Sequence, residues 1–283
     1  MSMSPFTFRK DFRPAYTKLN LLGTFMPHTP ILAMTATATA HYRNEIKRSL
    51  GMQNVLNVEA NPDRENIFYE VHPRGNRGDE KLITIIEPLA LELKEKLLAM
   101  PLTIVYSNLE TCGECYSYFE QELGPHQFYP AGSPAIFSNR LFAQYHAQYP
   151  EEYRDSLVKN LVSGTATARV LFVTVAFGVG IDVPTVERVI HIGVPYTMEE
   201  FFQETGRAGR NGSQAISTVY FNSYDISKGK RALEPIMRQY VTANSCRREI
   251  ILRHFGASVA SECCGHKCCD NCKRMCKCSN CCT

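Results

Sequence analysis

The chain contains no tryptophan among its 283 residues, and it also lacks the marks of several common protein classes. Its first ten residues, MSMSPFTFRK, have no apolar core of the signal-peptide type. The longest apolar run, VLFVTVAFGVGI at 170–181, is too short to span a bilayer. The formal net charge is only +3, which by itself indicates no particular partner. Secretion and membrane insertion are therefore not expected, and neither is a membrane partner.

What the chain does contain is enough apolar material for one or two ordinary cores, with 44% hydrophobic and 21% charged residues. Its twelve cysteines are unevenly spread. Cys112, Cys115 and Cys246 stand apart, whereas nine cysteines crowd into residues 263–283. Without a secretory signal, coordination of zinc by thiolates explains this clustering better than disulfide bonds do.

The zinc ligands are only partly fixed by spacing. Cys269 and Cys272 form a CxxC pair, with Cys246 upstream as a partner. The fourth ligand is Cys264, Cys263 or, with less support, Cys268. Four thiolates around one ion make a closed structural site without an open position for chemistry. Cys112 and Cys115 lie in TCGECYSYFEQEL, which is typical of a helix, and we interpret them as buried or exposed thiols without metal.

The end of the chain has two further features. Residues 263–283 form a basic tail, which is compatible with nucleic-acid binding. The tail contains four basic residues, Lys267, Lys273, Arg274 and Lys277, and one acidic residue, Asp270. A second zinc site is conceivable from the last cysteines, although adjacent cysteines cannot all bind one ion comfortably: Cys276, Cys278, Cys281 and Cys282.

Apolar runs and helical periodicities alternate along the chain, which predicts a parallel sheet covered by helices on both faces. The expected helices are 41–51, 79–100 with an interruption near Pro88, 111–123 and 151–164. The expected strands are 66–73, 102–107, 169–174, 188–195 and 217–221, and a further apolar run covers 30–37.

In parallel sheets, functional groups collect at the carboxyl ends of strands. Several strand ends in this sequence carry groups that can satisfy phosphate or ribose oxygens: Ser107, Asn108, Thr174, Thr35, Thr37, and Gly178, Gly180 and Asp182 in AFGVGID. Each alone would be ordinary turn chemistry. Their recurrence at several strand ends favours a nucleotide or nucleic-acid site.

The segment QETGRAGRNG at 203–212 follows a helical pattern and carries Arg207 and Arg210 three residues apart. If the helix continues, the two arginines share one face. The glycines of the segment remove bulk and permit close approach. Planar guanidinium groups suit phosphate oxygens.

The series AMTATAT, IVYSN, VTVAFGVGID and QETGRAGRNG, followed by the cysteine cluster, resembles the RecQ family of ATP-dependent DNA helicases of superfamily two. The resemblance runs from residue 11 to about Cys272. CRREIILRHFG followed by CCDNC is typical of RecQ enzymes and separates them from helicases without this zinc module.

The resemblance implies an α/β fold of RecA-like type, with a parallel sheet and helices on both faces, followed by a small helical zinc-binding subdomain. Residues 1–60 would be the remnant of a first RecA-like lobe and a linker. Residues 61–222 would form the second lobe, and residues 223–283 the zinc-binding subdomain with its basic tail.

The resemblance also implies roles for individual residues. Gln203, Arg207 and Arg210 would face ATP, with Arg210 the better candidate for the arginine finger. Asp182, Gly178 and Gly180 would contact the nucleotide. The remaining roles are DNA-backbone contact (Ser107, Asn108, Thr174, Phe12 and Arg13), coupling (Thr35 and Thr37) and zinc binding (Cys246, Cys264, Cys269 and Cys272). The implied activity is 3′-to-5′ DNA unwinding in the nucleus with ATP, Mg²⁺ and Zn²⁺, on single strands and duplex junctions.

Two motifs of an ATP-hydrolysing helicase are absent. No GxxxxGK[ST] occurs, because Gly229-Lys230 is followed by Arg231, and Asp79-Glu80 opens a helix instead of ending a strand. We therefore expect that the chain alone does not hydrolyse ATP and that a first lobe would act in trans. The alternatives are a non-enzymatic DNA-binding or regulatory module, and a structural zinc protein with vestigial motor motifs.

Overall fold

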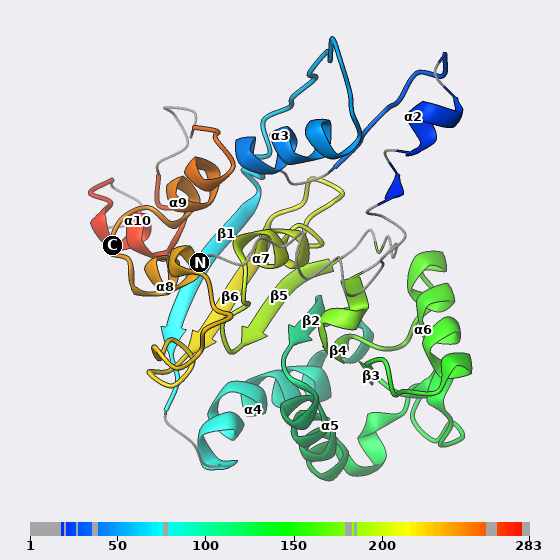
Figure 1. The fold of residues 1–283 in the computed structure, drawn as a ribbon. Coiled ribbons are helices and arrows are strands. Elements are labelled where there is room, and N and C mark those ends of the chain that lie inside the picture. Colours follow the sequence, from blue (N-terminus) through cyan, green and yellow to red (C-terminus); the bar gives the residue numbers. More distant parts are fainter. Residues whose placement is uncertain are drawn as a thin grey trace. The chain divides into compact units, whose positions relative to one another are not determined.

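The computed structural model describes residues 18–19, 21–26, 28–35, 39–75, 79–178, 183, 186–258 and 265–278 (Figure 1). The chain divides into two compact units. The smaller unit comprises Met1–Pro62 and Leu252–Ala257, and the larger comprises Asp63–Ile251 and Ser258–Thr283. In the described parts of the chain, no helix is both long enough and apolar enough to cross a membrane.

The larger unit is built on a six-stranded sheet in the order β1-β6-β5-β2-β4-β3. Every neighbouring pair is parallel, which confirms the fold class expected from the alternation of strands and helices. The strands are β1 (Ile67–Pro73), β2 (Leu102–Tyr106), β3 (Phe142–Tyr145), β4 (Val170–Val173), β5 (Val186–Ile192) and β6 (Ala215–Phe221). β2 and β4 are buried at every position because strands flank them and helices cover them.

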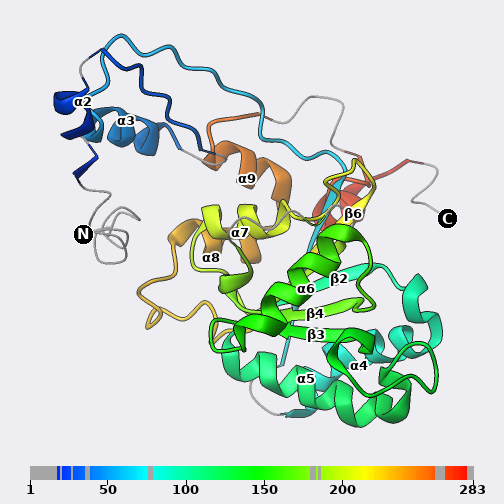
Figure 2. The ribbon, with the colours of Figure 1, turned by 90° about the vertical axis from the view of Figure 1, so that its right-hand side faces the viewer.

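Helices lie on both faces of this sheet, with α4 and α5 on one face and α7 on the other (Figure 2). The α-helices of the larger unit are α4 (Asp79–Lys96), α5 (Leu109–Leu123), α6 (Glu151–Ser163), α7 (Met198–Thr205), α8 (Pro235–Thr242), α9 (Arg247–His254, whose end enters the smaller unit) and α10 (Asp270–Met275). Short 3₁₀ turns cover η2 (Leu97–Ala99), η3 (Gly124–Gln127), η4 (Phe137–Asn139) and η5 (Val175–Gly178).

A hydrophobic core lies between the sheet and the pair α4 and α5. Phe119 of α5 contacts Phe172 of β4 edge to face, with ring centroids 4.8 Å apart. Cys112 and Cys115 are fully buried in the same core, and burial raises the pKa of the Cys112 thiol to about 12. The helix expected around these cysteines is confirmed, and they are buried apolar side chains of the core.

Three expectations about the secondary structure are wrong. Pro88 lies inside α4 without ending it, because apolar side chains on both sides of the proline pack into the core and hold the helix. The segment between 128 and 150, in which no strand is predicted, contains the edge strand β3. Residues 30–35 form no strand although their sequence is apolar.

The smaller unit contains α2 (Leu21–Phe25) and α3 (Ala40–Ser49). Thr39 is the N-cap of α3, and its hydroxyl accepts a hydrogen bond from the Tyr42 N–H at 3.4 Å. Arg43 of this helix pairs with Glu59 at 3.3 Å. The expected helix at 41–51 is thus confirmed, with its start one residue earlier and its end two residues earlier.

Candidate functional site

The carboxyl ends of β2 and β4 lie side by side in the larger unit. The Ser107 N–H donates to the Val173 carbonyl at 3.0 Å, and the Thr174 N–H donates to the Tyr145 carbonyl at 3.2 Å. Both residues are half-buried. The Thr174 hydroxyl oxygen accepts a hydrogen bond from the Ala176 N–H at 3.4 Å, which shapes the turn after the strand. Ser107 and Thr174 therefore lie at the ends of neighbouring strands, and we call this pair the polar site.

Asn108 has a structural role at this edge. Its Oδ1 accepts a hydrogen bond from the Thr111 N–H at 2.8 Å and caps the first turn of α5. Such a cap satisfies an orphan backbone donor and stabilises a helix by about 1 kcal/mol. The cap occupies the amide oxygen of Asn108, and the predicted contact of this residue with DNA stays a prediction.

Two more of the predicted residues lie in the described part of the chain. Gly178 ends the 3₁₀ turn η5 that follows Thr174. Thr35 is exposed in the smaller unit. The other predicted residues lie outside the described residues: Phe12, Arg13, Thr37, Gly180, Asp182 and Cys264.

The glycine-arginine segment does not continue the helix before it, which corrects the expectation that its arginines share a helical face. α7 ends at Thr205, and residues 206–211 form turns. Arg207 is buried with 6% exposure, whereas Arg210 and Gln203 are exposed. The two arginines are therefore suited to different tasks, one inside the lobe and the other at its surface.

Two side chains that precede β1 hold the glycine-arginine segment. Arg64 donates from Nη1 to the Gly206 carbonyl at 3.2 Å, and from Nη2 to the Ala208 and Gly209 carbonyls at 3.0 and 2.9 Å. Asn66 donates from Nδ2 to the Gly209 and Ser213 carbonyls at 2.8 and 2.6 Å. The turn is thus fixed by charge-assisted and amide hydrogen bonds to its backbone.

These contacts explain why a glycine is needed at position 209. Gly209 has a φ of +60°, and an added Cβ would lie 2.3 Å from Asn66 Nδ2. What approaches this glycine is the chain's own Asn66, so close approach by a ligand is not required to explain it. Sequence reasoning missed Arg64 and Asn66 because they lie 142 to 147 residues from their partners. No local motif marks them.

The backbone around Gly209 and the residues that follow the segment lie at the amino ends of β5, β6 and β1. The Gly209 N–H donates to the carbonyl of Val186, the first residue of β5, at 2.8 Å. The N–H of Ala215, which opens β6, donates to the carbonyl of Asn66 at 2.9 Å, directly before β1. Ser107 and Thr174 lie at the opposite, carboxyl edge.

Arg207 connects this segment with the loop after Thr174. Its guanidinium carbon lies 5.7 Å from the ring centroid of Phe177, which is buried in η5. Its positive charge also acts on Tyr106 at the end of β2. Burial, and to a smaller extent the Glu204 carboxylate, raise the pKa of the Tyr106 phenol above its usual range, and Arg207 opposes this rise. Arg207 is therefore within electrostatic reach of both strands that carry the polar site.

A buried pair fixes α7 above the same edge. His191 Nε2 and Glu204 Oε2 lie 2.9 Å apart, and their side chains are only 3% and 7% exposed. The His191 ring stacks on Tyr106 at a centroid distance of 5.2 Å. This contact links the end of α7, directly before the glycine-arginine segment, to the end of β2.

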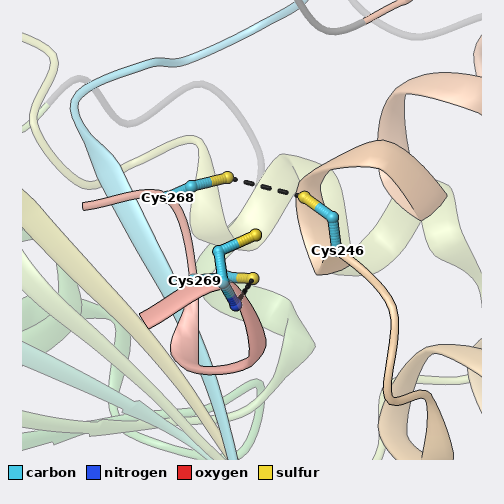
Figure 3. Close-up of side chains that lie close together, drawn as sticks. Cys246, Cys268 and Cys269 are labelled. Carbon is cyan, nitrogen blue, oxygen red and sulfur yellow. Dashed lines mark hydrogen bonds between the residues drawn. The ribbon is translucent and has the colours of Figure 1, made fainter. Parts of the chain in front are cut away.

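A cluster of four thiols lies beside β1, from Cys246, Cys268, Cys269 and Cys272, with all four sulfur atoms within 4.8 Å of one another. Cys246 and Cys268 point toward each other at 3.5 Å, with Cys269 beside them (Figure 3). A zinc ion held by thiolates at about 2.3 Å places its sulfur ligands about 3.8 Å apart, so the cluster fits Zn²⁺.

The electrostatics of this four-thiol cluster favour a thiolate at Cys269, whereas the neighbouring sulfur atoms raise the pKa of the Cys268 thiol and burial raises the pKa of the Cys272 thiol. Hydrogen bonds from the Cys246 and Cys268 thiols, together with those from the Cys272 and Arg247 N–H groups, hold the pKa of Cys269 well below its usual range. The fourth thiol in the cluster is Cys268, which the spacing ranked below Cys263 and Cys264. The bridge between Tyr69 of β1 and Cys269 brings this part of the chain to the sheet.

Comparison with known proteins agrees with this architecture. Residues 132–212 match the helicase conserved C-terminal domain, and residues 225–273 match the RecQ zinc-binding model. The chain is 31% identical over 272 residues to ATP-dependent DNA helicase Q-like 2 of Arabidopsis thaliana, an alignment that covers 93% of this chain and 35% of that protein. It is 30% identical to ATP-dependent DNA helicase Q1 of Mus musculus, covering 93% of this chain and 38% of that protein.

Among solved structures, helicase Lhr of Mycobacterium smegmatis bound to ssDNA and AMP-PNP has a similar fold, with a TM-score of 0.57 at 20% identity, covering 80% of this chain and 27% of that one. The sheet and its loops thus define a RecA-like helicase lobe of the C-terminal type. The chain belongs to the RecQ family, of which it carries the C-terminal part of the helicase core and the zinc-binding region. It spans between a third and two fifths of the length of the two curated relatives named above.

Proposed function

We propose that the chain supplies the second RecA-like lobe and the zinc platform of an ATP-dependent 3′-to-5′ DNA helicase. In this proposal residues 61–222 form the lobe, residues 223–283 the platform, and residues 1–60 the end of a first lobe with its linker. Support for the helicase class comes from the family and from the polar site at the ends of β2 and β4. Support for the direction of unwinding comes from the family resemblance alone.

The observation that carries the proposal is the position of Arg207. Its buried guanidinium joins the glycine-arginine segment to Phe177, three residues after Thr174. Arg210 is exposed and lies in the same segment, and its charge would act on an ATP γ-phosphate presented by another lobe. A shift of the segment on nucleotide binding would reach the Thr174 site through Arg207. The chain's own residues thereby link nucleotide to DNA.

ATP and Mg²⁺ would be held by a first lobe, and this chain would add the charge of Arg210 to the transferring phosphoryl group. Ser107 and Thr174 would position a DNA strand through its phosphates, without reading base sequence. The four-thiol cluster would hold one structural Zn²⁺, with Cys268 as the fourth thiol among the described residues, whereas the predicted ligand Cys264 lies outside them. A nuclear location follows from the family resemblance and would be tested with a fluorescently tagged chain in eukaryotic cells.

DNA binding is tested by fluorescence anisotropy with a single-stranded DNA oligonucleotide at two salt concentrations. We expect binding that weakens steeply with salt, because phosphate neutralisation releases counterions. Thr174→Ala removes one hydroxyl contact and should weaken binding by about three- to tenfold. Arg13→Ala tests the predicted contribution of the amino-terminal segment. Absence of binding by a folded, zinc-loaded chain would contradict the proposed DNA interface.

ATP hydrolysis is measured in parallel, first with the pure chain and then with a separately purified first lobe of a RecQ helicase. We expect no DNA-stimulated turnover by the chain alone and some turnover in the mixture. Arg210→Ala should abolish that turnover, whereas Arg231→Ala, at another exposed arginine, should not. Turnover by the pure chain would contradict the need for a first lobe. DNA binding without turnover in the mixture would favour a non-enzymatic DNA-binding module.

A further inference from the structure

A second group of metal-binding side chains lies at the far end of α10 from the four-thiol cluster. His266 precedes α10, Cys276 is its C-cap residue and Cys278 follows two residues later. His266 Nδ1 lies 3.2 Å from Cys278 Sγ and 3.9 Å from Cys276 Sγ. All three donor atoms lie within 4.8 Å of one another, and all three residues are half-buried.

These distances match the edges of a tetrahedral zinc site. With Zn–S near 2.3 Å and Zn–N near 2.1 Å, a nitrogen and a sulfur ligand lie about 3.6 Å apart. The two nitrogen-to-sulfur distances fall on either side of that value. A hydrogen bond would explain one contact between the imidazole and a thiol, but it would not bring the second thiol to the same nitrogen. Thiolate and imidazole are the donors that zinc selects.

We propose that His266, Cys276 and Cys278 bind a second zinc ion, of which they supply three ligands among the residues that the structure describes. The site shares no ligand with the four-thiol cluster. Two of its cysteines were considered for a second zinc site from sequence, but His266 was not. The inference does not depend on DNA binding or ATP hydrolysis by the chain.

The second ion would have a mechanical consequence for α10. This helix has only six residues, which is too short to be stable without external contacts. Cys269 and Cys272 tie its first turn to the four-thiol cluster, and Cys276 and Cys278 would tie its other end to His266. The basic tail, which carries exposed Lys267, Lys273 and Lys277, would then be fixed at both ends of α10.

The test is the zinc content of the full chain, measured by mass spectrometry after removal of loosely bound metal. We expect two zinc ions per wild-type chain and one in a triple variant, His266→Ala with Cys276→Ser and Cys278→Ser. Lys277→Ser is the matched control, because this exposed residue lies between the two cysteines, and it should keep two ions. One ion in the wild type, or two in the triple variant, would overturn the proposal.

Titration of the metal-free wild-type chain with Co²⁺ keeps the proposal testable if the triple variant does not fold. We expect two equivalents to bind. One should show the charge-transfer intensity of four thiolates, and the other the weaker intensity of two thiolates and one imidazole. Saturation at one equivalent would overturn the proposal.

Discussion

Arg248 and Asp63 form a buried ion pair that ties the start of α9 to the segment before β1. Nη1 of Arg248 lies 2.6 Å from Asp63 Oδ1, and the two side chains are only 1% and 5% exposed. The same guanidinium donates to the Arg64 and Ile67 carbonyls at 2.6 Å, and its Nε lies 3.4 Å from Cys268 Sγ. The four-thiol cluster is thereby connected to Arg64, whose side chain holds the glycine-arginine segment.

Replacing Arg248 with methionine should destabilise the larger unit by about 3–5 kcal/mol, because it leaves the Asp63 carboxylate buried without its partner. The measurement is urea unfolding followed by circular dichroism, with zinc present in excess. Arg231→Met, at an exposed arginine, is the control and should change the free energy of unfolding by less than about 0.5 kcal/mol. Equal effects of the two substitutions would contradict this account.

Gly209 and Gly212 offer a matched pair for testing why glycine occupies the segment. Both have positive φ, at +60° and +83°. Only at Gly209 would an added Cβ meet other atoms, whereas at Gly212 it would meet open space. Gly212→Ala should cost about 1 kcal/mol from backbone conformation alone. Gly209→Ala should cost about 3 kcal/mol, because Asn66 must also move and lose its hydrogen bonds. Thermal unfolding of the two variants measures the difference, and a smaller loss for Gly209→Ala would refute the proposed clash.

Arg207 and Arg210 should differ in what their removal does to stability. Arg207→Ala removes a packed guanidinium from the ring of Phe177 and should cost about 1–2 kcal/mol. Arg210→Ala alters an exposed side chain and should leave the free energy of unfolding within about 0.5 kcal/mol of wild type. Urea unfolding of both variants is the measurement. A large loss for Arg210→Ala would mean that this arginine serves the fold instead of a ligand.

The sequence predicts the sheet well and the site only in part, for physical reasons. β2 and β4 are buried apolar runs, and such runs are recognisable because both faces of a parallel sheet must be apolar. Ser107 and Thr174 follow directly from the ends of those strands. β3 was missed because it has only four residues and begins after an irregular stretch.

The contacts that hold the site arise from tertiary structure. Arg64, Asn66 and Arg248 act on backbone carbonyls far away in the sequence, and a backbone carbonyl leaves no signal in residue type. The choice between Cys268 and Cys264 depends on how the chain turns before α10. Spacing alone cannot determine that turn, and it also does not predict that His266 lies close to Cys276 and Cys278.

Glu92 of α4 should make the stability of the larger unit depend on pH in the acid range. Its carboxylate receives hydrogen bonds from Arg188 of β5 and from Lys96, and these hold the pKa of Glu92 down to about 2 from 4.5. Because the folded-state pKa is the lower one, the stabilisation is present above pH 4.5 and is lost as the pH falls toward 2.

Glu92→Gln should therefore cost about 1–3 kcal/mol at pH 7, where wild-type Glu92 is charged in both the folded and unfolded states. The difference between variant and wild type should shrink progressively as the pH falls from 4.5 toward 2, where the wild-type carboxyl becomes protonated in both states. Urea unfolding at a series of pH values measures this difference. Glu95→Gln, on an exposed position of the same helix, is the control. A Glu92→Gln penalty that stays constant down to pH 2 would show that the loss comes from packing and not from the charge of the Arg188 pair.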